Sequence, residues 1–144
     1  MEVCKICIAT LVGTTIMTAF SYLVSESFKK LFKEPVLLNL LIAKSELNIS
    51  PERKNILGWL IHYAIGLSFV IAYHLVWKHT EIDPTWFSGL IFGIVSGFIG
   101  IASWHFMFRL SKNPPQIHFK EYYIQLFIAH IFFALGVVAT YKAF

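Results

Sequence analysis

The chain has 144 residues, of which 57% are hydrophobic and 14% are charged. Globular proteins average roughly 45–50% apolar and 25% charged residues, so this composition argues against an ordinary soluble domain. The net charge of +4 does not indicate a nucleic-acid partner. The basic residues lie beside apolar stretches, where membrane topology and anionic lipids account for them. We therefore expect one membrane domain over residues 1–144.

Four long apolar stretches predict an all-α fold, with four transmembrane helices in an antiparallel bundle. At ~1.5 Å rise per residue, each stretch is long enough to cross a hydrocarbon core of roughly 30 Å. The first follows a single lysine but has no small-residue cleavage site, so it is interpreted as a retained span. The spans are expected at about residues 3–25, 53–78, 85–109 and 118–142.

Helix-start signals mark the second and third spans. Ser50, Pro51 and Glu52 combine an N-cap residue, a proline at the first helical position and an acid in the first turn. Asp83 and Pro84 give the same signal before the third span. The connection between these two spans is short, so we expect them to be antiparallel neighbours.

An apolar run between the first and second spans is too short to cross a bilayer. It begins at Pro35, directly after the basic segment 29–34. Runs of this length are typical of interfacial helices. We expect a short cytoplasmic interfacial helix at about residues 35–47, with nearby lysines at the lipid phosphates. A plain linker is the alternative.

Lysine and arginine are distributed unevenly between the two ends of the predicted bundle. Only Lys5, Lys78 and Lys142 lie at the end that holds the termini, and the other nine of twelve lie in the opposite connections. The positive-inside rule therefore predicts external N- and C-termini and cytoplasmic basic loops. The pattern resembles that of small four-span bacterial inner-membrane proteins, so we expect an integral protein of a bacterial inner membrane.

Several cationic side chains are expected to contact lipid head groups at the cytoplasmic surface. Two of them are one helical turn apart near the end of the third span. The predicted head-group contacts are Lys29, Lys30, Lys33, His105 and Arg109.

Small and polar residues mark helix contacts in membranes, where leucine against leucine gains little. Four glycines of the third span fall within a wedge of roughly 80°, and the first three of them form a tandem GxxxG pattern. They predict close packing against a neighbouring helix, with a ligand in the groove as the alternative: Gly89, Gly93, Gly97 and Gly100. The first span carries a Ser/Thr stripe, which indicates either helix packing or the lining of a hydrated path.

Two histidines are predicted to lie deep in the bundle. Counted from the cytoplasmic edge, His62 is at ~10 Å and His130 at ~16 Å. Ionisable groups at such depths are uncommon and are often functional. Glu26 is the one acid that we expect near them, at an exposed position. His74, His79 and His118 are expected to be solvated.

We therefore predict a weakly polar pocket in the cytoplasmic half of the bundle that binds a lipid-like or cofactor ligand. It would be lined by Thr18, Ser21, His62, Gly66, Tyr73, Gly97, Gly100, Tyr123 and His130. One alternative is a haem or metal site, with His62 and His130 as ligands. Another is an oligomeric transporter of small solutes or protons. Membrane lipids, a second copy of the chain and a partner membrane subunit are the expected partners.

No catalytic motif is present, whether Gly-x-Ser-x-Gly, His-Glu-x-x-His or a Walker loop, so we expect binding rather than catalysis. Cys4 and Cys7 form a Cys-x-x-Cys at the start of the first span. In this respect the chain resembles four-helix membrane enzymes that pass disulfide electrons to quinone. Those enzymes need a second cysteine pair, which this chain lacks. Two small apolar residues are the other interpretation.

Overall fold

The structure is a computed structural model that describes residues 2–45 and 49–144. Within these residues all regular elements are helices: α1 (Glu2–Phe28), α2 (Glu34–Ala43), α3 (Ile56–His79), α4 (Trp86–Leu110) and α5 (Phe119–Ala143). The four longer helices are long and apolar enough to cross a membrane. The predicted all-helical fold is confirmed, and the chain is an integral membrane protein.

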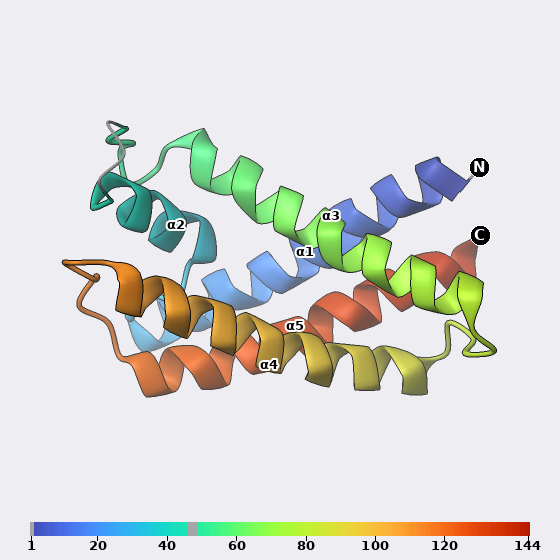
Figure 1. The fold of residues 1–144 in the computed structure, drawn as a ribbon. Coiled ribbons are helices and arrows are strands. Elements are labelled where there is room, and N and C mark those ends of the chain that lie inside the picture. Colours follow the sequence, from blue (N-terminus) through green and yellow to red (C-terminus); the bar gives the residue numbers. More distant parts are fainter. Residues whose placement is uncertain (1, 46–48) are drawn as a thin grey trace.

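The helix α5 is the centre of the bundle. It packs against both α4 and α1, while α3 packs against α1 and α2. In the most apolar 18-residue stretch of α5, 56% of the residues are buried inside the protein, compared with 33% or less in the other spans. Both termini and the α3–α4 connection lie at one end, here called the terminal end (Figure 1). The helix α2 lies at the opposite end, here called the α2 end.

Large apolar side chains cover the outside of the bundle. Leu60, Phe98 and Phe106 are each at least 60% exposed. A soluble protein rarely exposes so large an apolar surface to water, whereas lipid chains accommodate it. The inner face of α1 is instead formed by small and polar residues: Ala9, Thr10, Gly13, Thr14, Met17, Thr18, Ser21 and Ser25.

The glycines of α4 face α5. A Cβ atom at Gly93 would lie 2.7 Å from Cα of Ile131, and one at Gly89 would lie 2.7 Å from Cγ2 of Val138. A Cβ atom at Gly100 would meet the ring of His130, 2.5 Å from Cε1. The absence of side chains at these positions therefore allows the two helices to approach closely.

Two helix starts differ from the predicted ones. The side chain of Asn55, not Ser50, caps α3 by accepting a hydrogen bond from the N–H of Leu57 at 2.9 Å. Thr85 caps α4 in a reciprocal capping box with Ser88. Each cap needs a side-chain oxygen within two or three residues of the N–H it binds. The earlier Ser-Pro and Asp-Pro signals are too far from the helices, and they lie in the preceding turns.

The short helix α2 is packed into the bundle rather than spread over its surface. Its first six residues, 34–39, are all buried. A Cβ atom at Gly58 would lie 2.1 Å from the carbonyl oxygen of Pro35, so only a glycine allows α3 to pass this close to α2. The helix ends at Ala43, and residues 46 and 47 of the expected segment lie outside the described residues.

The helices α3 and α4 are joined by a short connection, but they are not packed against each other along their length. In the described residues, α3 makes extensive backbone contacts with α1 and α2 only. An apolar groove of about 300 Å³ separates α3 from α4. The two spans are antiparallel, and their side chains meet in the terminal half, where Tyr73 contacts Phe92 and Ser96. Toward the α2 end they are separated.

Candidate functional site

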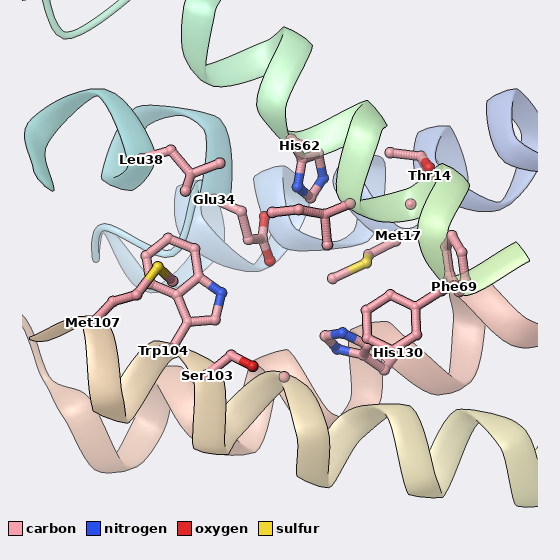
Figure 2. Close-up of a pocket in the computed structure, with 14 residues that line it drawn as sticks. Thr14, Met17, Glu34, Leu38, His62, Phe69, Ser103, Trp104, Met107 and His130 are labelled. Carbon is pink, nitrogen blue, oxygen red and sulfur yellow. The ribbon is translucent and has the colours of Figure 1, made fainter. Parts of the chain in front are cut away.

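A cavity of about 70 Å³ lies in the half of the bundle near the α2 end, and all five helices contribute to its wall (Figure 2). Three ionisable side chains, Glu34, His62 and His130, line it together with apolar side chains. The remaining lining residues are Thr14, Met17, Leu38, Ile65, Gly66, Phe69, Gly100, Ser103, Trp104, Met107 and Phe133. The site is therefore a mostly apolar space with a few polar groups.

Six of the nine predicted site residues meet at this cavity or directly behind it. His62, Gly66, Gly100 and His130 line it. Thr18 lies 2.9 Å from Nε2 of His62, and Ser21 donates a hydrogen bond to Glu34 at 2.6 Å. The rings of His62 and His130 extend from α3 and α5 toward the same space (Figure 2).

The other three predicted residues lie elsewhere. The hydroxyl of Tyr73 is 2.5 Å from that of Ser96, and Tyr73 lines the α3–α4 groove. Gly97 faces the ring of Phe127. Tyr123 is only half-buried and does not line the cavity. Tyr123 lies two turns before His130 on the same side of α5. Because His130 is at one edge of the buried face of this helix, Tyr123 falls between the buried and the exposed side chains.

The hydrogen bonds around His62 determine which ring nitrogen carries a proton. The hydroxyl of Thr18 donates its single hydrogen to the carbonyl oxygen of Thr14 at 2.6 Å. It therefore accepts a hydrogen bond from Nε2–H of His62. Nδ1 of His62 makes no hydrogen bond within the described residues. In this tautomer Nδ1 holds a free lone pair.

The hydrogen bond of His130 places the ring proton on Nδ1, whereas in His62 it is on Nε2. Nδ1 of His130 is 2.8 Å from the carbonyl oxygen of Leu126, which can only accept a hydrogen bond. Nδ1 therefore carries the hydrogen, and Nε2 of the neutral ring has the lone pair. Within the residues that the structure covers, nothing donates to Nε2.

Glu34 is the functional candidate that the sequence prediction missed. It is 1% exposed, and its Oε1 accepts the hydrogen bond from Ser21, which in turn accepts one from Gln125 at 2.5 Å. Burial raises the pKa of the Glu34 carboxyl to about 7, and the hydrogen bond from Ser21 opposes this shift. Oε2 is buried and has no hydrogen-bond partner. The available signal was its place in the first turn of a helix, directly before the apolar run 35–38.

Glu26 and His74, two other ionisable residues considered in the prediction, both lie outside the cavity. Glu26 is exposed and forms an ion pair with Lys33, as expected for a residue outside the site. His74 was expected to be solvated, but its side chain is largely buried and contacts the hydroxyl of Tyr141 at 3.0 Å and Glu2 at 3.2 Å. The fold brings the start of α1 and the end of α5 next to this turn of α3.

The predicted head-group residues divide into two places. Lys29, Lys30 and Lys33 line a cleft at the α2 end, described below. His105 is exposed on α4, and its Nδ1 is 3.3 Å from the hydroxyl of Tyr123. Arg109 is exposed near the end of α4. Head-group contact by His105 and Arg109 stays a prediction.

The cavity has few features of a metal or haem site. Within residues 2–45 and 49–144, no group of three or more His, Cys, Asp or Glu side chains can hold a metal ion. Structural metal sites usually have four ligands, and His62 with His130 supplies two. A space of about 70 Å³ is also far smaller than a porphyrin.

No protein-family model, curated protein or solved structure matches this chain. The fold and the site therefore define its class. It is a helical membrane protein with four spans, whose small internal cavity is bordered by two imidazoles and one carboxyl group.

Proposed function

We propose that this protein binds an amphipathic molecule taken from the bilayer. Its small head group would lie in the cavity, and its apolar chain would lie in the groove between α3 and α4. The observation that carries this proposal is the set of unused acceptors at the cavity residues: Oε2 of Glu34, Nδ1 of His62 and Nε2 of His130. Of these atoms, Oε2 of Glu34 is buried without a partner, which costs about 1–3 kcal/mol, so a ligand that donates a hydrogen bond to it gains this energy.

The chemistry of these acceptors favours a primary ammonium group. An ammonium has three N–H donors and no acceptor, which matches three acceptors in number and kind. An ionised Glu34 would also neutralise the charge of the ammonium group. Charge-assisted hydrogen bonds are about twice as strong as neutral ones. A carboxylate head group would instead place a second anion beside Glu34.

The sizes of the two spaces support a division between head and chain. Ligand pockets usually measure ~300–1,000 Å³, so the cavity of about 70 Å³ has room for a head group only. The groove adds about 300 Å³ and has an almost wholly apolar wall. Phe69 lines both spaces, so its ring lies between the groove and the cavity.

Transport through the bundle has less support. The cavity lies in one half, and aromatic rings fill the other half along the same helices. Tyr73 and Trp77 of α3 contact Phe92 of α4, with ring centroids 4.9 and 5.4 Å apart. A path for protons or solutes would have to cross this packed region.

We also infer that the α2 end faces the cytoplasm of a bacterium and that both termini lie outside the inner membrane. The concentration of lysine and arginine at the α2 end supports this orientation. Cys4 and Cys7, the only cysteines, are free and exposed near the N-terminus. A membrane-impermeant maleimide should therefore label intact cells. Labelling only after the membrane is opened would reverse the orientation.

The direct test of binding uses purified protein and three probes with the same twelve-carbon chain. Dodecylamine, dodecanol and dodecanoate are added separately, and native mass spectrometry counts the molecules bound and the copies of the protein. We expect one dodecylamine per chain, weaker binding of dodecanol and none of dodecanoate. Equal binding of all three probes would refute a head-group site.

Substitutions then locate the bound amine. His62→Ala and His130→Ala should each lower the affinity about tenfold, because one hydrogen bond to a charged group is worth about 1.5 kcal/mol. His79→Ala is the matched control, since His79 is an exposed residue at the far end of α3. Equal effects of the three substitutions would remove the case for an inner site.

A further inference from the structure

A second concave surface lies at the α2 end, on the outside of the bundle. It is a cleft of about 650 Å³, here called the basic cleft, between the end of α1, the start of α2 and the start of α3. Among the described residues, Glu26 is the one acid on its wall, whereas five cations line it: Lys29, Lys30, Lys33, Arg53 and Lys54. Segments more than twenty positions apart in the sequence thus contribute positive charge to one hollow.

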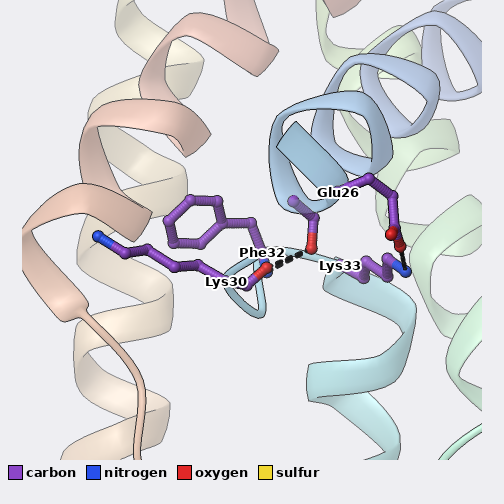
Figure 3. A network of polar contacts seen from close by, with 5 residues as sticks. Glu26, Lys30, Phe32 and Lys33 are labelled. Carbon is purple, nitrogen blue, oxygen red and sulfur yellow. Dashed lines mark hydrogen bonds and ion pairs between the residues drawn. The ribbon is translucent and has the colours of Figure 1, made fainter. Parts of the chain in front are cut away.

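Two of these five cations already have partners. Lys33 forms an ion pair with Glu26, and Lys30 forms one with Glu121 of α5 (Figure 3 shows both lysines). Within the described residues, Lys29, Arg53 and Lys54 have no acidic partner. The described part of the cleft therefore carries more positive than negative charge.

A buried hydroxyl fixes the first basic segment. Ser25 donates a hydrogen bond to the carbonyl oxygen of Lys30, and its oxygen accepts one from the N–H of Phe32 at 3.3 Å (Figure 3). Lys33 also lies over the ring of Tyr22, with Nζ 4.9 Å from the ring centroid. This turn is consequently held against the end of α1.

A buried amide fixes the second basic segment. The side chain of Asn39 is 1% exposed, and its Nδ2 donates to the carbonyl oxygens of Arg53 at 3.3 Å and Asn55 at 2.7 Å. Its Oδ1 accepts from the N–H of Gly58 at 2.8 Å. The backbone of Arg53 is therefore tied to α2, and both basic segments are held in fixed positions.

Lys29 follows the end of α1 in a backbone conformation that glycine usually takes. Its φ angle is 52°, and it is the only non-glycine residue with positive φ among those described. This left-handed conformation is unfavourable for residues with a Cβ atom and is usually taken by glycine. A lysine here keeps a cation at the rim of the cleft despite an unfavourable backbone.

We propose that the basic cleft is a binding site for one phosphate group. Arginine binds phosphate through paired N–H donors, and lysine adds point charges. Trp59 and Tyr22 also line the cleft, and such rings favour the level of lipid head groups. The phosphate can belong to a lipid or to a soluble compound. This site is separate from the cavity and does not depend on the ligand proposed there.

The test uses the full chain in a maltoside detergent, which carries no phosphate. In one arm, inorganic phosphate and glycerol phosphate are titrated from solution; in the other, phosphatidylglycerol is added to the micelles. The fluorescence of Trp59, in a variant whose other tryptophans are phenylalanine, reports occupancy. We expect a saturable change in at least one arm, and that arm identifies the source of the phosphate. No saturable change in either arm would overturn the proposal.

Charge substitutions separate a built site from general attraction to anions. Arg53→Ala and Lys54→Ala should each weaken binding about tenfold, which corresponds to one charged contact. Lys120→Ala is the matched control, because it removes one exposed cation at the same end but outside the cleft. A similar loss in Lys120→Ala would show diffuse attraction and contradict the proposal.

Lys29→Gly distinguishes binding from structural support. Glycine tolerates the left-handed backbone, so this variant should melt no lower than the wild type while it binds phosphate about tenfold more weakly. Unchanged affinity in Lys29→Gly would remove Lys29 from the site. A variant that both melts lower and binds normally would assign it a structural role only.

Discussion

The two halves of this bundle bury their polar and small residues in different ways. In the terminal half, the hydroxyl of Tyr73 is bonded to Ser96, and glycines of α4 meet α5 without space between them. In the α2 half, His62, His130 and Glu34 surround a cavity, and Oε2 of Glu34 lacks a partner. Nε1 of Trp77 in the terminal half is also buried without a partner. The contrast between the halves therefore lies in the cavity and its three ionisable side chains, which favour binding in the α2 half.

The largest expected effect comes from Glu34→Gln, measured as stability against pH without added amine. The raised pKa of Glu34, about 7 against an ordinary 4.5, means that the folded protein keeps its proton where the unfolded chain has lost it. The stability from this group is complete below pH 4.5, falls as the pH rises to 7 and stays low above. At 1.36 kcal/mol per pKa unit, the loss is roughly 3 kcal/mol.

The variant should lack this loss, because glutamine does not titrate. Its stability relative to the wild type should therefore increase between pH 4.5 and pH 7.5, as followed by thermal unfolding in detergent. Bound dodecylamine should reduce the difference by pairing with the ionised carboxylate. Parallel pH curves for the two proteins would show that Glu34 is not buried as described.

The next effect compares two glycines of the same helix. Gly93→Ala places a methyl group against the backbone of α5 and should destabilise the protein by about 2 kcal/mol. Gly100→Ala meets only the ring of His130, which has the cavity to move into. It should lose less than about 1 kcal/mol but bind the amine more weakly.

Thermal unfolding and dodecylamine titration of both glycine variants check this contrast. A larger destabilisation in Gly100→Ala than in Gly93→Ala would mean that the α2 half is packed as tightly as the terminal half. The division between the two halves would then be wrong.

A smaller effect is expected for Thr18→Val, which keeps the shape of the side chain and removes the hydroxyl. His62 then loses the acceptor for its Nε2–H, so stability should fall by about 1 kcal/mol. Amine affinity should also fall, because the tautomer of His62 is no longer fixed. Thr140→Val is the control, since its hydroxyl bonds only within its own helix. Equal amine affinity in the two variants would show that Thr18 does not orient His62 for binding.

The smallest effect is expected for Glu121→Gln, which breaks the ion pair with Lys30. Glu121 is exposed, and such pairs contribute about 0–1 kcal/mol. The melting temperature should change little, and phosphate affinity at the basic cleft should rise because Lys30 becomes free. Weaker phosphate binding in this variant would show that the pair supports the cleft.

The spans, the inward side of α1 and the interior position of His62 and His130 followed from hydrophobicity and helical periodicity. These properties depend on local sequence, and the bilayer makes them strong signals. The same reasoning placed Gly66 and Gly100 on the wall of the pocket, where the structure has them. It also put Thr18 and Ser21 on that wall, whereas they lie behind it and bond to His62 and Glu34.

Glu34 could not be found in this way, because its burial depends on α2 packing against α3 through Gly58 and Asn39. The prediction also placed Tyr73 and Tyr123 in the pocket. Periodicity gives a face of a helix, but it does not say which neighbour covers that face. Tyr73 faces the groove between α3 and α4 instead of the cavity. Tyr123 shares a line on α5 with His130, which is at the edge of the buried face of that helix.

The most direct test of the central claim is photo-crosslinking in native membranes. The probe is a long-chain primary amine that carries a diazirine next to its amino group. We expect labelling of the peptides that contain residues 62–69 and 100–107, which line the cavity, and loss of this labelling in Glu34→Gln and His130→Ala. Labels spread over the lipid-facing residues of all four spans, unchanged by these substitutions, would contradict it.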